Sequence, residues 1–132
     1  MAKMRRSRYT TNSQVSLVVK SSVSAKAAVL INDILKPKHV KTPSADARFN
    51  YIVDIYSKWS RNYFYFCAKY ACPGQNAISS YFESKFARLE YTDTNSFSLS
   101  YMRHTGKWIE LYAGLSLDDS LAIIKDDPNF LT

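Results

Sequence analysis

The segment from Trp59 to Gly74, WSRNYFYFCAKYACPG, holds the residues of this chain best suited to ligand binding or thiol chemistry. Six aromatic side chains fall within twelve positions, and Cys67 and Cys72 flank the last tyrosine. Aromatic rings on a sheet surface stack on bases or form partner interfaces, and a cysteine can serve as a nucleophile or a metal ligand. The segment is also consistent with an ordinary buried core.

The cysteine pattern disfavours thiol chemistry. A Cys-x4-Cys pair differs from common zinc spacings, and His39 and His104 are the only histidines available to complete a site. A nucleophilic cysteine also needs an activating base or a helix N-terminus. We therefore predict no metal site and no cofactor, and we interpret Cys67 as a small hydrophobic residue.

Alternation along residues 63–71 predicts a strand with two different aromatic faces. Phe64 and Phe66 are the cheaper residues to bury, because a buried tyrosine hydroxyl must find a hydrogen-bond partner. We expect Cys67 and Lys69 to share the other face. The aromatic face predicted from this alternation and from its neighbours comprises Trp59, Tyr63, Tyr65, Trp108 and Tyr112.

Three explanations fit such a face. It could stack nucleic-acid bases, it could be a dimer or partner interface, or the C-terminal helix and the Phe130-Leu131 tail could cover it as core. The sequence leaves these alternatives open.

A second candidate site is the segment YMRHTGKW. Arg103 and His104 precede a tight turn, and Lys107 and Trp108 follow it, so the turn could hold a phosphate or a carboxylate. The alternative is a solvated turn without a ligand.

Catalysis is the less favoured class. No Gly-rich phosphate loop, nucleophile elbow or paired-carboxylate motif is present, and we assign no catalytic residue. An enzyme or small-ligand protein with a pocket between helix and sheet near His104 is the alternative.

Positive charge is concentrated in the first third of the chain. Residues 1–48 contain ten Lys/Arg and two acids, whereas residues 49–132 contain eight and nine. We divide the chain into a basic, disordered arm at 1–22 and a single domain at 23–132. Through Arg5, Arg6 and Arg8 the arm could contact nucleic acid or an anionic membrane surface. The alternative is a solvated arm that only aids solubility.

No apolar run approaches the roughly 20 residues that a membrane-spanning helix needs. The apolar stretch Val15–Val19 is also too short for the core of a signal peptide. We therefore expect a cytoplasmic protein with no membrane span.

The periodicity predicts one helix, several strands and a final helix. Ser24 is expected to cap a helix that Pro37 ends, and alternation from Phe49 predicts a strand with Phe49, Tyr51, Val53 and Ile55 on one face. A turn at 60–62 and the strand at 63–71 follow. We then expect a helical turn at 78–82, strands at 84–92, 97–104 and 107–113, and a short helix capped by Ser116.

This order predicts a two-layer α+β fold. An antiparallel meander of about five strands would be packed by the N-terminal helix, with a cystatin-like or roll-like outline.

Three segments, NYFYFCAKYACPGQNA, YMRHTGKW and LSLDDSLAIIKDDP, resemble small bacterial proteins without an assigned activity. The resemblance covers roughly residues 49–128 and implies a single bacterial domain. It brings no functional residue.

Together these observations predict a small non-catalytic binding module. We expect it to form a homo-oligomer through its aromatic sheet face and to contact nucleic acid through its basic arm.

Overall fold

The computed structural model describes residues 15–40, 49–74, 79–93 and 96–131. Its elements are α2 (Leu17–Leu30), the π-helical η1 (Ile31–Leu35), α3 (Lys36–His39), β2 (Tyr51–Ser60), β3 (Tyr63–Ala71), β4 (Tyr81–Asp93), β5 (Ser96–Met102), β6 (Trp108–Leu115) and α4 (Leu117–Asp126). The strands form one antiparallel sheet in the order β2-β3-β4-β5-β6. The predicted α+β class with a five-stranded meander is therefore confirmed.

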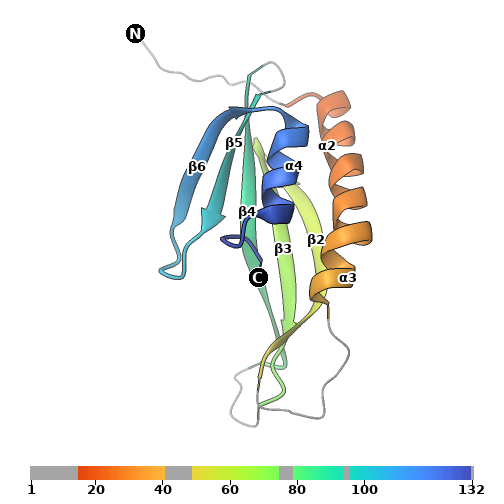
Figure 1. Ribbon diagram of the computed structural model, residues 1–132, viewed down its shortest axis with the longest axis vertical. Helices are drawn as coiled ribbons and strands as arrows, with labels where there is room; N and C mark the ends of the chain where they lie inside the picture. The colour runs from red at the N-terminus through yellow and green to blue at the C-terminus, as the bar shows by residue number, and fades with distance from the viewer. Residues whose placement is uncertain (1–14, 41–48, 75–78, 94–95, 132) are drawn as a thin grey trace.

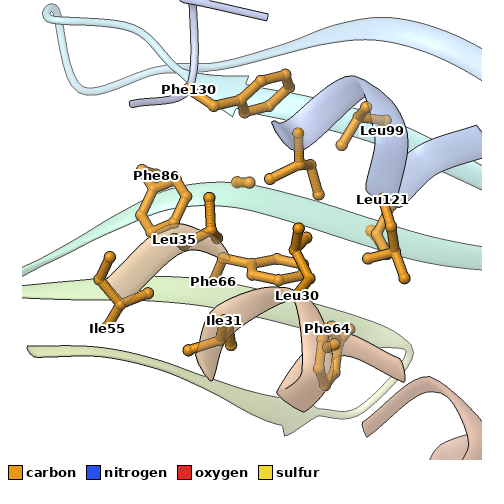
Figure 2. Packing of buried hydrophobic residues seen from close by; sticks show 14 of the residues in the cluster. Leu30, Ile31, Leu35, Ile55, Phe64, Phe66, Phe86, Leu99, Leu121 and Phe130 are labelled. Atoms are coloured by element: carbon orange, nitrogen blue, oxygen red, sulfur yellow. The ribbon is translucent and has the colours of Figure 1, made fainter. Parts of the chain in front are cut away.

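The N-terminal helical segment, which runs from α2 through η1 to α3, and the C-terminal helix α4 pack on the same face of the sheet (Figure 1). Phe64 and Phe66 point into the core between the layers, and only 1% and 0% of their surfaces are exposed. Residues from both helical segments, including Leu30 and Leu121, belong to the same cluster (Figure 2). The prediction that these two phenylalanines face inward is confirmed.

The other face of the sheet is covered by no helix or strand that the structure describes (Figure 1). Phe130 instead packs on the helix side, where its ring lies 6.3 Å from that of Tyr101. The alternative in which the C-terminal helix and tail cover the aromatic face is therefore wrong.

The N-terminal helix is longer than predicted at both ends. Ser16, rather than Ser24, is its cap, because the Ser16 hydroxyl accepts a hydrogen bond from the Val19 N–H at 3.2 Å. The predicted boundary between arm and domain at residues 22 and 23 lies inside α2. Pro37 does not end the helix, because it occupies the first turn of α3 directly after the wider π-helical turn of η1.

The first strand does not keep the predicted face. A bulge between Ile52 and Asp54 interrupts its pairing with β3, so the buried residues are Ile52 and Ile55. Phe49 lies before the strand and is 66% exposed. An inserted residue shifts the alternation by one position, which a strict period of two cannot anticipate.

Residues 79–82, the described part of the helical turn expected at 78–82, form no helical turn. Tyr81 begins β4 and pairs with Ala71, and the ring of Phe82 stacks on Tyr70 at 4.8 Å. The Cys72 N–H donates to the Ser80 carbonyl at 2.8 Å, which continues the contact between the two chain segments. Pairing with β3 thus prevails over the local helix-capping pattern.

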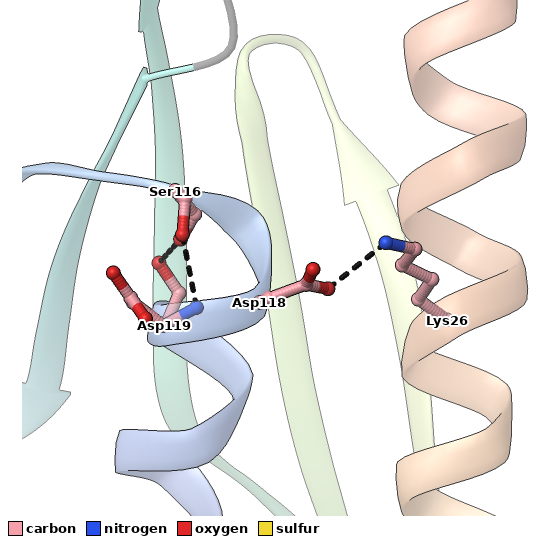
Figure 3. Close-up of polar contacts among 5 residues, drawn as sticks. Lys26, Ser116, Asp118 and Asp119 are labelled. Atoms are coloured by element: carbon pink, nitrogen blue, oxygen red, sulfur yellow. Dashed lines mark hydrogen bonds and ion pairs between the residues drawn. The ribbon is translucent and has the colours of Figure 1, made fainter.

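The predicted hairpin of the last two strands and the predicted C-terminal helix are both present. The Ser116 hydroxyl accepts from the Asp119 N–H at 3.1 Å and caps α4 (Figure 3). Gly106, with a φ of 85°, turns the chain between β5 and β6. Within the described residues, no helix combines the length and apolar character that a membrane span requires.

Candidate binding face of the sheet

We call the sheet side that faces away from the helices the open face. One cross-strand row runs over it through all five strands, because Lys58 pairs with Tyr65, Tyr65 with Arg88, Arg88 with Ser100, and Ser100 with Glu110. Directly opposed residues of an antiparallel sheet project to the same side. The row therefore places cationic, aromatic and small side chains next to one another and ends in the exposed carboxylate of Glu110.

Arg88 lies between two aromatic rings. The carbon of its guanidinium group is 4.5 Å from the ring centroid of Tyr63 and 4.7 Å from that of Trp108. The Trp108 ring also contacts Tyr65, with 5.9 Å between their centroids. Ser100, which opposes Arg88, is small and only 5% exposed, which leaves room for these larger side chains to lie across β5.

Two lysines extend this pattern along the open face. The Lys85 Nζ lies 4.6 Å from the ring centroid of Tyr65, and the Lys69 Nζ lies 4.8 Å from that of Tyr81. A cation over an aromatic face at a partly exposed site contributes about 0.5–1 kcal/mol. We name Tyr63, Tyr65, Lys85, Arg88 and Trp108 the cation–aromatic cluster.

The cluster's cations are not paired with carboxylates in the part of the chain that the structure describes. The ion pairs found there are Lys26–Asp118, Lys36–Asp54 and Lys125–Asp126. An anion that approaches Lys85 or Arg88 would therefore not have to displace a carboxylate from an ion pair in this part of the chain.

The neighbouring carboxylates are held by tyrosine hydroxyls. Burial first, and then a hydrogen bond to Glu83, raise the pKa of Tyr56 well above its ordinary range. Burial and then the charge of Glu90 raise the pKa of Tyr63, which also hydrogen-bonds that carboxylate. These phenols therefore stay neutral and donate to the acids at physiological pH.

Cys67 shares the open face but is only 1% exposed. Burial is the main cause of its raised pKa, although the charges of Lys58 and Lys85 and a hydrogen bond with Tyr56 act in the opposite direction. A protonated, buried thiol is a poor nucleophile. Both cysteines are free, and no three His, Cys, Asp or Glu side chains gather into a metal-binding group within the described residues.

The structure does not bring every predicted residue to the open face. Trp59 opposes Phe64 on the covered face, where the two ring centroids are 5.0 Å apart and the indole N–H donates to the Lys20 carbonyl at 3.3 Å. A bulge in β6 places Tyr112 opposite the core residue Leu99, and Tyr112 remains 45% exposed outside the cluster.

Arg103, His104 and Lys107 are exposed in the turn between β5 and β6, next to Trp108. This turn is closed by the Arg103 N–H, which donates to the Lys107 carbonyl at 2.8 Å. His104 lines neither of the two cavities that flank α2 and α4. Arg5, Arg6 and Arg8 lie outside the described residues.

Sequence reasoning missed the central residue, Arg88, although a signal for it was present. Arg88 and Glu90 alternate with Ala87 and Leu89, which places them on the exposed side of the predicted strand. Only the strand order shows that this side adjoins Tyr63 and Trp108.

No curated protein and no solved structure matches this chain. The sequence model of one family, described as a domain of unknown function (DUF3024), matches residues 16–131, a range that contains every described helix and strand. The chain therefore belongs to the DUF3024 family.

Proposed function

We propose that the open face binds single-stranded nucleic acid. The observation that supports this proposal is the cation–aromatic cluster, in which Arg88 lies between Tyr63 and Trp108 and Lys85 lies over Tyr65. Aromatic platforms next to unpaired cations on an uncovered sheet are the elements that single-strand binders use.

The two residue types have different roles in this proposal. Exposed ring surface stacks on bases, at about 1–3 kcal/mol per base, while lysine and arginine contact phosphates. The Arg88 guanidinium carbon lies 4.5 Å from the Tyr63 ring centroid and 4.7 Å from that of Trp108. In this proposal its N–H groups donate to a phosphate oxygen.

A single strand fits this surface better than a duplex. The faces of paired bases are stacked within a duplex and cannot reach an aromatic side chain without being flipped out. We infer a cytoplasmic location, where RNA would supply single-stranded segments.

Self-association through the same face is the competing proposal. Two copies meeting there would bring Lys58, Lys85 and Arg88 toward the same cations of the partner, and like charges facing each other are unfavourable. Glu83 and Glu90 already accept hydrogen bonds from tyrosines. Within the cross-strand row, the cations Lys58 and Arg88 stand against one exposed carboxylate, Glu110. This excess of positive charge supports a polyanion over a second copy.

The basic N-terminal residues belong to the same proposal. Arg5, Arg6 and Arg8 lie within four positions, and no acid precedes Asp33. In single strands, log affinity falls with log salt by about 0.7 for each phosphate neutralised. Deleting residues 1–14 should flatten this salt dependence, whereas Tyr65→Ala should weaken binding without changing its slope.

Fluorescence anisotropy with a labelled oligothymidylate tests the proposal in the full-length chain. We expect binding at ~50 mM salt that Tyr65→Ala or Trp108→Ala weakens about tenfold, since each removes one stacking ring. Tyr112→Ala is the matched control, because it removes an exposed aromatic residue outside the cluster. Absence of binding, or equal losses in all three variants, would contradict the proposal.

A further inference from the structure

One outer side of α2 exposes apolar residues, although a helix that covers a sheet usually turns such residues toward the core. Leu17, Val18 and Val29 are 81%, 80% and 60% exposed. Val18, Ser22, Ala25 and Val29 follow spacings of four, three and four residues, which places them along one side of the helix. This uncharged stripe faces solvent in the described part of the chain.

Two cavities lie beside this stripe, between α2 and α4. The first has a volume of about 320 Å³ and is lined by residues that include Val18, Val23, Phe97 and Leu117. The second has a volume of about 340 Å³, and Val29, Leu30, Ile34 and Leu121 contribute to its walls.

Lys26 and Asp118 line both cavities and form an exposed ion pair of 2.9 Å across them (Figure 3). The two cavities are thus parts of one groove, which the Lys26–Asp118 ion pair crosses. An exposed ion pair contributes little stability and can rearrange when a partner arrives.

The two helical segments that border the groove carry opposite charges. The segment from α2 to α3 contains Lys20, Lys26, Lys36 and Lys38 with one acid, Asp33. Helix α4 contains Asp118, Asp119 and Asp126 with one cation, Lys125. A two-fold axis through the groove would set the basic helix of each copy against the acidic helix of the other, which makes the surface self-complementary.

We propose that this groove is a dimer interface whose occupant is the α2 helix of a second copy. The apolar stripe of each α2 packs into the groove of the other, and lysines from one copy face the aspartates of α4 in its partner. The open face of the sheet lies on the opposite side of each copy, so the dimer leaves both open faces free.

Light scattering after size exclusion tests this proposal on the full-length chain. We expect the mass of a dimer at roughly 100 µM and low salt, with dissociation as salt rises and weakens the charge contacts. Val29→Asp should give a monomer, because it places a carboxylate in the apolar stripe and opposite the acidic helix. Thr105→Asp, in the exposed turn after β5, is the matched control and should remain a dimer.

Far-UV circular dichroism accompanies each variant. If Val29→Asp fails to fold, Val18→Asp replaces it at the other cavity, where the native side chain is 80% exposed. A wild-type monomer at roughly 100 µM, or a dimer that survives the folded Asp variant, would overturn the proposal. Dissociation by Tyr65→Ala instead would place the contact on the open face and would also overturn it.

Discussion

The two faces of strand β3 differ in burial and in residue type, although their residues alternate along the same nine-residue segment. Phe64, Phe66 and Ala68 are at most 1% exposed beneath the helices. Tyr63 and Tyr65 contact each other on the open face, where cations also lie over their rings. The covered face determines stability, whereas the open face carries the proposed binding chemistry.

This difference follows from the phenol oxygen. A phenylalanine ring can be enclosed without leaving a polar atom unsatisfied, whereas a tyrosine hydroxyl needs a partner. Tyr63 finds that partner in the Glu90 carboxylate at the surface of the sheet. The two types of ring therefore separate onto the two faces.

The largest expected effect is the loss of stability on the covered face. Phe66→Ala should lower the free energy of unfolding by about 3–5 kcal/mol, because it leaves a cavity in a fully packed site. Tyr65→Ala should cost about 1–2 kcal/mol, because its ring is partly exposed. Urea denaturation measures both, and equal losses would remove the distinction between the faces.

High pH should destabilise the fold through groups on both faces. Burial raises the pKa of Cys67 and Tyr70, and burial together with nearby carboxylates raises that of Tyr56 and Tyr63. The neutral forms are favoured in the folded state, so this stabilisation is complete below the ordinary pKa values of about 9 and 10. It is lost as pH rises from there toward the raised values.

Urea denaturation between pH 7 and 11, followed together with tyrosinate absorbance, checks this expectation. The free energy of unfolding should decrease above about pH 9, and part of the tyrosinate absorbance change should appear only when the protein unfolds. Full tyrosine titration near pH 10 in the folded protein would contradict the assigned burial.

The core face of β3 could be predicted from sequence because alternation and the cost of burying a hydroxyl act locally. The face of the sheet on which Trp59 lies could not be predicted in this way, because it depends on how the residues of β2 pair with those of β3. A turn of Arg61 and Asn62 pairs Ser60 with Tyr63, which sets Trp59 opposite Phe64.

Bulges account for the other errors. Each one inserts a residue without altering composition, and it reverses the face of every residue beyond it. This explains why Tyr112 leaves the predicted aromatic face and why Val53 is not part of the core. The contacts of Arg88 with Tyr63 and Trp108 could not be predicted without the order of the strands in the sheet. That order depends on contacts between residues that are distant in the sequence.

A smaller effect on stability and binding should show whether the cation–aromatic cluster needs only the positive charge of Arg88 or also its planar guanidinium group. Arg88→Lys keeps the positive charge but loses the planar group that lies between Tyr63 and Trp108. We expect the free energy of unfolding to fall by roughly 0.5–1 kcal/mol and oligonucleotide affinity to fall several-fold. Arg88→Ala should weaken binding further, and identical behaviour of both variants would argue against a stacking role for the guanidinium.

The two tryptophans allow the central claim to be tested directly, because Trp108 lies on the open face and Trp59 on the covered face. Trp59→Phe leaves Trp108 as the only indole, and Trp108→Phe leaves only Trp59. Each variant is titrated with unlabelled oligothymidylate while its tryptophan fluorescence is recorded. If bases stack on the open face, the emission of Trp108 should be quenched in a saturable manner, and that of Trp59 should stay constant. Unchanged Trp108 emission at concentrations where anisotropy shows binding, or equal quenching of both indoles, would contradict the assignment of nucleic-acid binding to the open face.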